Sequence, residues 1–362
     1  MKKVKIIVYG VIALFLLIFA AACQKKDEPK VTVGSDGTIQ GELTEGLEAN
    51  LTEIPAYDQQ LKRMKIQEKE IDPVFIKEKV FPMDDSAYTI DRPEGEVVRL
   101  ITEDGLVIVN SSGSTKAWDQ YNDFIHFRTA EDFHLETSTD GELGFQSRED
   151  TEKQMRKLAE DLGISFEVKT IHIEAYTGEY FTELIEAIGE NKIYVDFVKP
   201  ETLERNWSEA DDVYYAEITF AQEGIPVEKE DITLRDDTFI QGLKMQVYLT
   251  EEGIQSFDLN PLAFADISQE EEIEIIGIPE GIETVMEKYE NIVSEEKVEI
   301  VNSQVTYMFL PEGMGGDLYL IPVIRFDTRS TVLMNSTESS QPVETVIEDT
   351  ILVNGQTGRI LE

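Results

Sequence analysis

The sequence predicts an α+β fold made of tandem modules, each an amphipathic helix packed on an antiparallel sheet, with a flexible tether in front of them. Two observations indicate this architecture: an amphipathic helical pattern occurs twice, and strand-like segments follow each copy in the same order. A third observation is the length of 362 residues, which exceeds what one small core needs and predicts two or three domains.

The first helical pattern begins at Ser147, where a serine followed by acidic residues is typical of a helix N-terminus. The helix is expected to end at Gly163, and the second pattern begins after Pro279. Each helix has one apolar face and therefore has to cover an apolar surface. Residues at i, i+3, i+4 and i+7 form these faces, namely Met155, Leu158, Ala159 and Leu162 in the first copy and Ile282, Val285, Met286 and Tyr289 in the second.

Alternating apolar and polar residues, typical of a strand, follow each helix. The alternation changes phase at Thr170-Ile171 in the first copy and at Ile300-Val301 in the second. Because a β-bulge produces such a change of phase, the sequence predicts the same bent strand in both modules. Further strand-like segments lie at 214–220, 245–249, 318–326 and 351–353, and a helical insert is expected at 181–188.

Composition divides the chain into five expected parts. The stretch after Cys23 is rich in Gly, Glu, Thr and Pro, and its scattered apolar residues bury too little surface to offset the entropy of ordering. The five parts are a signal peptide at 1–22, a cysteine and flexible tether at 23–60, a small α+β or β-rich domain at 61–146, the first module with its insert at 147–278, and the second module at 279–362.

The charge balance is strongly acidic, with 73 Asp and Glu against 32 Lys and Arg and a formal net charge of -41. Binding to a phosphate backbone depends on Lys and Arg that neutralise negative charge, so nucleic acid is not expected as a partner. The acidity maintains solubility and limits self-association, or it serves the capture of Ca²⁺ or of basic partners. Both interpretations stay open.

Cys23, the one cysteine of the chain, follows a segment that is typical of an export signal. Lys2, Lys3 and Lys5 form a basic start, residues 6–22 carry no charge, and small residues precede the cysteine. This order resembles the bacterial lipoprotein signal, in which the chain is cut before the cysteine and the thiol receives a diacylglyceryl group. The resemblance implies lipidation of Cys23, attachment to the membrane through this lipid, and a body on the outer face of the cell membrane. An uncleaved span is the alternative, since the uncharged run is near the minimum of about 17 residues.

The helix TEKQMRKLAEDLGI, the strand LYLIPVIRF and the closing segment LVNGQTGRILE resemble PepSY-type domains, over about 147–362. Tandem copies occur in lipoproteins and membrane-anchored proteins of Gram-positive bacteria, including the YycH and YycI type of accessory regulator for a cell-wall histidine kinase. The resemblance implies a regulatory or binding module at the envelope, an envelope or membrane protein as partner, and no catalytic residue. It makes Asn354, Gly355 and Gly358 structural turn residues.

The sequence predicts no catalytic residue, no metal site and no cofactor. His126, His134 and His172 lack a compact zinc spacing, and the folded body has no thiol. Nucleophile-elbow and phosphate-loop patterns are also absent, and the glycine cluster at 313–316 is expected to be a loop between strands. Acidic clusters without calcium-loop spacing are expected in solvated loops or at a helix start: Asp84-Asp85, Asp211-Asp212, Asp236-Asp237 and Glu270-Glu271-Glu272.

These observations together predict a membrane-anchored extracytoplasmic lipoprotein that acts as a non-catalytic binding or regulatory module at the cell envelope. Two alternatives stay open. One is a solute-binding lipoprotein of a transporter. The other is an envelope hydrolase with paired carboxylates, whose spacing is set in three dimensions and not along the sequence.

Overall fold

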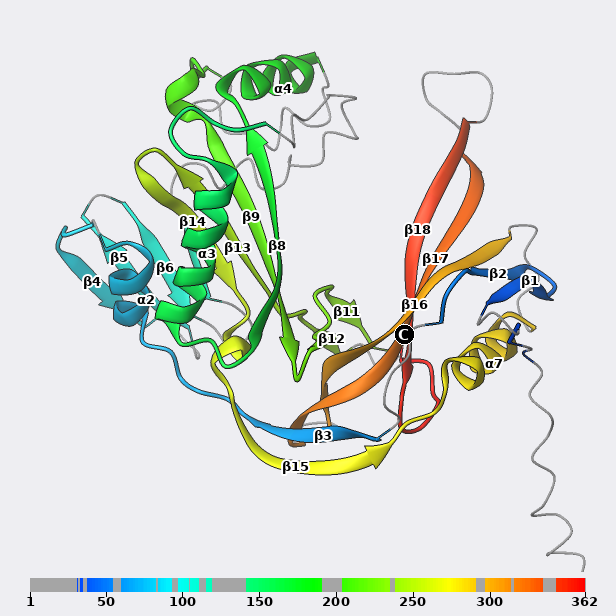
Figure 1. The fold of residues 1–362 in the computed structure, drawn as a ribbon. Coiled ribbons are helices and arrows are strands. Elements are labelled where there is room, and N and C mark those ends of the chain that lie inside the picture. Colours follow the sequence, from blue (N-terminus) through cyan, green and yellow to red (C-terminus); the bar gives the residue numbers. More distant parts are fainter. Residues whose placement is uncertain are drawn as a thin grey trace, which may run out of the picture.

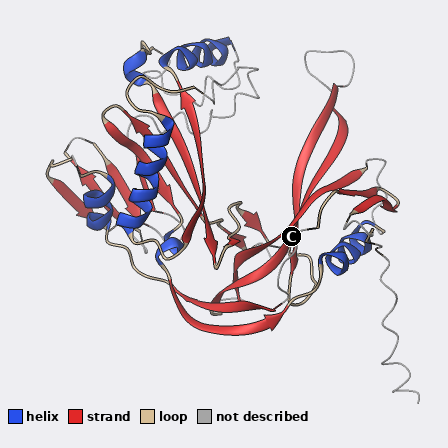
Figure 2. Ribbon diagram, in the orientation of Figure 1, coloured by secondary structure: helices blue, strands red, loops and turns tan. Residues whose placement is uncertain are grey.

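A computed structural model of the protein describes residues 31, 33–34, 38–54, 60–82, 84–92, 97–103, 105–110, 115–118, 141–190, 204–234, 238–290, 297–313, 316–334 and 343–361. Cys23 and the predicted signal peptide lie outside the described residues, as do His126, His134 and Asp236-Asp237. Strand makes up 50% and helix 21% of the described residues. Sheets therefore determine the architecture, and helices lie against them (Figure 2).

Sheet A contains strands from both ends of the described chain. They are β1 (Ile39–Thr44), β2 (Leu47–Leu51), β3 (Gln60–Gln67), β15 (Asp266–Glu274), β16 (Val298–Pro311), β17 (Leu318–Met334) and β18 (Val343–Asn354). Their order is β1-β2-β16-β17-β3-β15, and β18 also pairs with β17. The pairing of β16 with β2 is parallel, and the other described strand pairs of this sheet are antiparallel.

Sheet B is antiparallel throughout its described ladders. Its strands are β4 (Tyr88–Asp91), β5 (Val98–Thr102), β6 (Val107–Asn110), β7 (Thr115–Trp118), β8 (Glu167–Tyr176), β9 (Val213–Gln222), β10 (Ile225–Pro226), β13 (Lys244–Thr250) and β14 (Gly253–Leu259). Their order is β10-β9-β13-β14-β7-β6-β5-β4, with β8 beside β9. A short ribbon of β11 (Ile232–Thr233) and β12 (Phe239–Ile240) lies between the two large sheets (Figure 1).

The helices form where the sequence places their signals. In α3 (Arg148–Leu162) the Ser147 hydroxyl accepts from the Asp150 backbone N-H at 3.1 Å, and Gly163 ends the helix with φ 67°. Both predicted ends of this helix are confirmed. The other described helices are α2 (Pro73–Val80), α4 (Gly178–Glu190), α7 (Ile278–Tyr289) and the 3-10 helices η3 (Glu209–Asp211) and η4 (Pro261–Phe264).

The predicted bulges are also confirmed. The β8–β9 register shifts between Val168 and Thr170, and the β16–β17 register shifts between Ile300 and Asn302. Each bulge lies at the change of phase in the sequence, because one extra residue moves the apolar side chains to the other strand face.

The predicted fold class, a helix on a single antiparallel sheet in each module, is wrong. The described residues form several large antiparallel and mixed sheets, a half-barrel among them. β3 and β15, which are about 200 residues apart in the sequence, pair with each other and run together between the two halves (Figure 1). Local patterns show which segments are strands, but they carry no information on pairings between such distant segments.

The prediction of a flexible tether as far as residue 60 is wrong for 39–51. These residues form the β1–β2 hairpin, in which Ile39, Leu47 and Leu51 are buried. They pack in one cluster with α7 and with Phe326 of β17. The scattered apolar residues of this stretch therefore have a partner surface, and residues more than 200 positions later provide it.

A shared hydrophobic core joins sheets A and B. The rings of Phe166 and Phe309 lie 5.9 Å apart at 88°, and both belong to a cluster that also contains core residues of sheet B. Val227 forms a parallel bridge with Tyr307, and the Glu228 backbone N-H donates to the Tyr307 carbonyl at 2.7 Å. The halves are thus in direct contact at this junction.

The closing turn confirms the roles predicted for its residues. Asn354 Oδ1 accepts from the backbone N-H groups of Gln356 and Thr357 at 3.0 and 2.9 Å, and Gly358 has φ 66°. A Cβ on Gly355 would lie 2.8 Å from the Pro322 carbonyl oxygen. Asn354, Gly355 and Gly358 are therefore structural turn residues.

Candidate functional site

A pocket of about 650 Å³ lies at the junction of the two sheets. Its walls are the 228–232 segment, which follows β10, and parts of β16, β17 and β18. We call this space the junction pocket. Its volume lies within the range of roughly 300–1,000 Å³ that is common for small-molecule sites.

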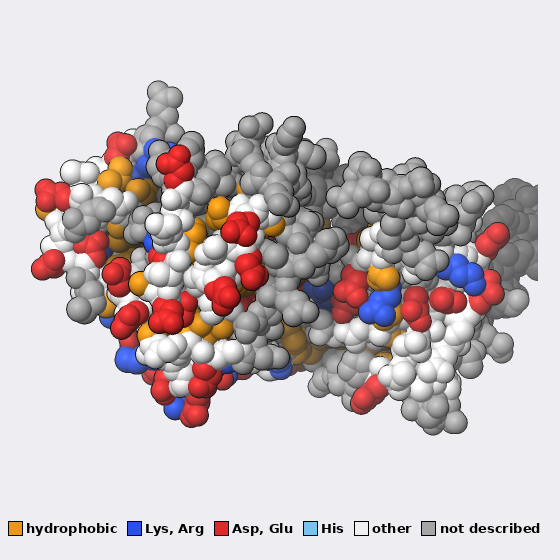
Figure 3. Space-filling view, turned by 90° about the horizontal axis from the view of Figure 1, so that it is seen from above, with side chains coloured by type: hydrophobic (Ala, Val, Ile, Leu, Met, Phe, Trp, Pro, Cys, Tyr) orange, Lys and Arg blue, Asp and Glu red, His pale blue; other side chains and the backbone are white. Residues whose placement is uncertain are grey.

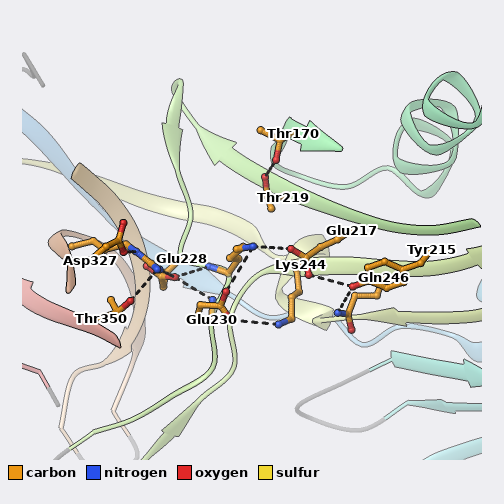
Figure 4. Close-up of polar contacts among 12 residues, drawn as sticks. Thr170, Tyr215, Glu217, Thr219, Glu228, Glu230, Lys244, Gln246, Asp327 and Thr350 are labelled. Atoms are coloured by element: carbon orange, nitrogen blue, oxygen red, sulfur yellow. Dashed lines mark hydrogen bonds and ion pairs between the residues drawn. The ribbon is translucent and has the colours of Figure 1, made fainter. Parts of the chain in front are cut away.

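Arg325 of β17 connects the walls of the junction pocket. Its Nη1 donates to Glu228 Oε1 at 2.6 Å, its Nε to Asp327 Oδ1 at 2.6 Å, and its Nη2 to Thr350 Oγ1 at 2.9 Å. Figure 4 shows Glu228, Asp327 and Thr350 converging on this position. Burial acts to lower the pKa of Arg325, but the charge of Glu228 and the hydrogen bond to Asp327 outweigh it and raise the pKa above its usual range.

Glu228 is the most deeply buried charged group of the pocket, with 3% of its side chain exposed. Its Oε1 also accepts from the backbone N-H groups of Lys229 and Glu230 at 3.0 and 3.1 Å. Its Oε2 has no hydrogen-bond partner among the described residues. The contact with Arg325 is therefore the main compensation for burying this carboxylate.

Gly242 determines how closely the neighbouring loop can approach this segment. A Cβ at this position would lie 2.1 Å from the Lys229 carbonyl oxygen, so any larger residue would displace the backbone. The Gly242 N-H donates to Asp231 Oδ1 at 2.9 Å. Glycine at this position thus holds the acidic segment against sheet B.

Polar contacts continue from the junction pocket onto sheet B (Figure 4). Lys229 Nζ lies 2.8 Å from Glu217 Oε1, and Glu217 Oε2 accepts from the Tyr215 hydroxyl at 3.2 Å. The Tyr215 oxygen accepts from Gln246 Nε2 at 2.7 Å. Burial acts to lower the pKa of Lys229, but the hydrogen bond that Lys229 donates to Glu217, together with the charge of Glu217, raises this pKa overall. Charges in both sheets are therefore coupled through direct contacts.

The junction pocket is acidic. Of its described lining residues six are acidic and two are basic; the acids are Glu228, Glu230, Asp231, Asp327, Glu348 and Asp349. Acidic side chains also outnumber basic ones over the face seen in Figure 3, as far as the described residues show it. The pocket can therefore bind a cationic or polar group, whereas its negative charge disfavours the binding of anions.

Glu270-Glu271-Glu272 lies in β15, so its predicted place in a loop or at a helix start is wrong. Glu270 Oε2 lies 2.9 Å from Lys62 Nζ of β3, and Asp266 Oδ1 lies 2.6 Å from Lys69 Nζ. Glutamate is a poor strand former by itself. The basic strand beside it supplies the cross-strand charges that offset this preference.

Asp84-Asp85 lies in a loop, as predicted, whereas Asp211 is buried at the end of η3, so the predicted solvated loop or helix start is wrong for this residue. Asp84 Oδ1 accepts from the Ser86 N-H at 2.9 Å, Asp211 lies in η3, and Asp212 Oδ1 accepts from the Gly178 N-H at the start of α4 at 2.9 Å. His172 Nε2 lies 3.0 Å from Glu174 Oε1 on β8. Within the described ranges, no group of three or more His, Cys, Asp or Glu residues is placed to hold a metal ion.

Asp258 of β14 is a partly buried carboxylate, with 26% of its side chain exposed, on the face of sheet B that also carries its register partner Gln246. Burial raises the pKa of Asp258 above its usual value of 3.8, although Lys116 Nζ at 3.0 Å acts in the opposite direction. Its Oδ1 has no hydrogen-bond partner among the described residues. The charged form is therefore disfavoured in the folded state.

We expect Asp258→Asn to stabilise the protein at pH 7 and to leave it unchanged near pH 3. A carboxyl with a raised pKa binds more protons folded than unfolded, so the free energy of unfolding falls as pH rises from 3.8 to the folded value. Thermal unfolding followed by circular dichroism between pH 3 and pH 7 measures this difference. Asp150→Asn is the control. The hydrogen bond from Ser147 and the contact with Lys153 lower the pKa of Asp150, so this replacement is expected to lower the free energy of unfolding at pH 7. A lower melting temperature for Asp258→Asn at pH 7 would contradict the expectation.

Sequence analysis did not identify Glu228 or Arg325. A usable signal was present, because Arg325 is the one charged residue of the apolar run LYLIPVIRF, and a charge within a buried strand requires a partner. Its partner Glu228 is 97 positions away and has no local signal. The one predicted site residue, Cys23, lies outside the described residues.

No protein-family model matches the chain, and a search of curated proteins finds no match. Among solved structures, an uncharacterized protein from Eubacterium rectale ATCC 33656 is similar to this chain, with a TM-score of 0.61 and 16% sequence identity. The similarity covers 90% of this chain and 93% of the other. At this identity it concerns the fold alone, and the resemblance to PepSY-type domains stays a prediction. The two-sheet architecture is therefore shared with a solved protein over nearly the full length of both chains.

Proposed function

We propose that the protein is a membrane-anchored extracytoplasmic lipoprotein that acts as a non-catalytic binding or regulatory module. The junction pocket carries this proposal. Its two cations are engaged by acidic partners, Arg325 by Glu228 and Asp327, and Lys229 by Glu217. Groups fixed in such pairs can recognise a ligand, whereas acid–base catalysis requires groups that change charge near the working pH.

The sequence around Cys23 supports attachment to the membrane, and the fold supports a short connection. Val31 is 3% exposed, belongs to the core cluster of α7 and the β1–β2 hairpin, and its N-H lies 3.4 Å from Glu283 Oε1. Val31 is eight positions after Cys23, and a chain of this length reaches at most about 28 Å. A lipid on Cys23 would therefore keep the α7 end of sheet A close to the membrane. Within the described ranges, no helix has the length and apolar character that a membrane span requires.

Metabolic labelling with an alkyne fatty acid in a bacterial host tests the anchor. We expect the label on the wild-type chain, its loss in Cys23→Ser, and a globomycin-sensitive shift in mass. A matched Ser35→Ala variant near the same end should keep the label. A wild-type chain that stays unlabelled would contradict the proposal.

A solute-binding lipoprotein of a transporter is the second candidate. The volume of the junction pocket, about 650 Å³, and its place between two sheets favour it. Thermal-shift measurements with sugars, amino acids, peptides and polyamines separate the candidates. A free solute that raises the melting temperature, and fails to do so after Asp231→Asn, would favour this second role.

A further inference from the structure

The outer part of the β17–β18 hairpin projects beyond the rest of sheet A (Figure 1). We call it the β17–β18 arm, residues 328–334 and 343–349. Val346 is 54% exposed and Ile347 is 43% exposed. Successive strand residues point to opposite faces, so the arm exposes a large apolar side chain on each face. β17 pairs with β16 as far as Ser330, and beyond this residue the described arm consists of β17 and β18 alone. A two-stranded ribbon is marginally stable by itself, which indicates a partner that covers Val346 and Ile347.

The free edge of the arm can be assigned to particular residues. The Leu352 carbonyl accepts from Leu361 N-H and the Asn354 N-H donates to the Arg359 carbonyl, so the backbone of these even-numbered residues points away from β17. The β17–β18 register is continuous, and the alternation therefore extends to Val346 and Glu348. Among the described residues, no hydrogen bond occupies the outward backbone groups of Val346 and Glu348.

The free edge of the arm ends at Thr350, on the side nearest the rest of sheet A. The outward N-H of Thr350 donates to Asp349 Oδ1 at 2.8 Å, which closes that donor to another strand. The same side of the arm is continuous with the junction pocket, because Glu348 and Thr350 line it. A strand that pairs with Val346 and Glu348 would therefore approach the acidic pocket from one end.

Charge determines which strand fits this edge. If two copies of β18 paired antiparallel about Val346 or Glu348, acidic positions of the two copies would lie directly opposite each other, and like charges across a ladder are destabilising. Glu348 is 71% exposed on its side chain and pairs at 2.9 Å with Arg329 of β17, which is also exposed, and Asp349 lines the pocket. A strand with Lys or Arg between apolar residues would pair favourably with these acids and cover Val346.

We propose that the β17–β18 arm binds an extended, basic and apolar segment of an envelope protein, which adds as a strand to the outer edge of β18. The backbone groups of Val346 and Glu348 pair with this segment. Its cationic side chains contact Glu348 and the acids of the junction pocket. The inference builds on the proposed binding role, but it is independent of lipidation, so its failure leaves the labelling test of Cys23 unaffected.

Fluorescence anisotropy with the full chain in detergent tests the arm. The probe is a fluorescein-labelled seven-residue peptide of alternating lysine and valine. We expect binding of this peptide, at least about tenfold weaker binding of a glutamate–valine peptide, and loss of binding when alternate peptide nitrogens are methylated. Equal binding of the glutamate–valine peptide, or no binding of the lysine–valine peptide, would overturn the proposal.

Two protein variants locate the contact. Val346→Pro removes an outward N-H without interrupting the ladder with β17. This variant should bind the lysine–valine peptide about tenfold more weakly, and its melting temperature should be unchanged. Glu348→Lys should weaken the binding of this peptide by a similar factor. Glu271→Lys, the same reversal on the exposed edge strand β15, is the control and should keep full binding. An equal loss of peptide binding in Glu271→Lys would show general charge attraction and overturn the proposal. Dimerisation of the wild-type chain that Val346→Pro abolishes would assign the edge to a second copy of the chain.

Discussion

Replacing Arg325 by methionine is expected to destabilise the protein by about 3–5 kcal/mol, because it leaves the buried Glu228 carboxylate without its cationic partner. The Glu228 side chain is 3% exposed and that of Arg325 is 15% exposed, so water cannot take over the lost contacts. Methionine keeps much of the side-chain volume and therefore limits the cavity. Urea unfolding at pH 7, followed by tryptophan fluorescence and circular dichroism, gives the free energy of unfolding.

Two controls separate the buried charge from simple loss of packing. In the double variant Glu228→Gln/Arg325→Met the buried charge of Glu228 is removed as well. Asp327 is 29% exposed on its side chain and keeps its hydrogen bond from Asn302, so most of the lost stability should return. Arg329→Met removes an exposed pair with Glu348, whose side chains are 49% and 71% exposed, and should cost less than about 1 kcal/mol. Similar losses in Arg325→Met and Arg329→Met would contradict the importance of burial.

Replacing Phe309 by alanine is expected to cost about 3–5 kcal/mol, because it opens a cavity in the core that joins the sheets. Phe309 is 2% exposed and packs edge to face on Phe166 at 5.9 Å. Sheets A and B contribute to the same cluster at this point, so the surroundings cannot collapse without moving one sheet against the other. Urea unfolding measures the loss.

A double-variant cycle with Phe166→Ala tests whether the two rings act together. We expect a coupling of about 0.5–1.5 kcal/mol between them. Phe239→Ala is the matched control, since Phe239 is 61% exposed, and it should change stability by less than about 0.5 kcal/mol. Additive losses from Phe166→Ala and Phe309→Ala would show that the rings stabilise their sheets separately.

Local sequence patterns predicted the local structure well. The Ser147 cap, the Gly163 end and both β-bulges follow from residues within a few positions of each other. The turn at Asn354 does so as well. Each of these features depends on hydrogen bonds or backbone angles that neighbouring residues determine.

The same patterns failed where distant segments meet. Residues 39–51 resemble a polar tether until α7 supplies the apolar surface that buries Ile39 and Leu51. Glu270 to Glu272 resemble a solvated cluster until β3 places Lys62 beside them. In both cases the energy that orders the segment comes from a contact more than 180 residues away in the sequence.

The sequence alone determined the acidic character of the protein, the positions of helices α3, α4 and α7 and of the two bent strands, and the expectation that Cys23 anchors it. These properties belong to single residues or short windows. Only the tertiary structure decided that the chain forms two joined sheets, that Glu228 and Arg325 meet in a pocket between them, and that the outer edge of β18 at Val346 and Glu348 has no partner strand among the described residues. The physical reason is that burial, pairing and edge exposure are properties of contacts between distant residues, and a one-dimensional pattern does not contain these contacts.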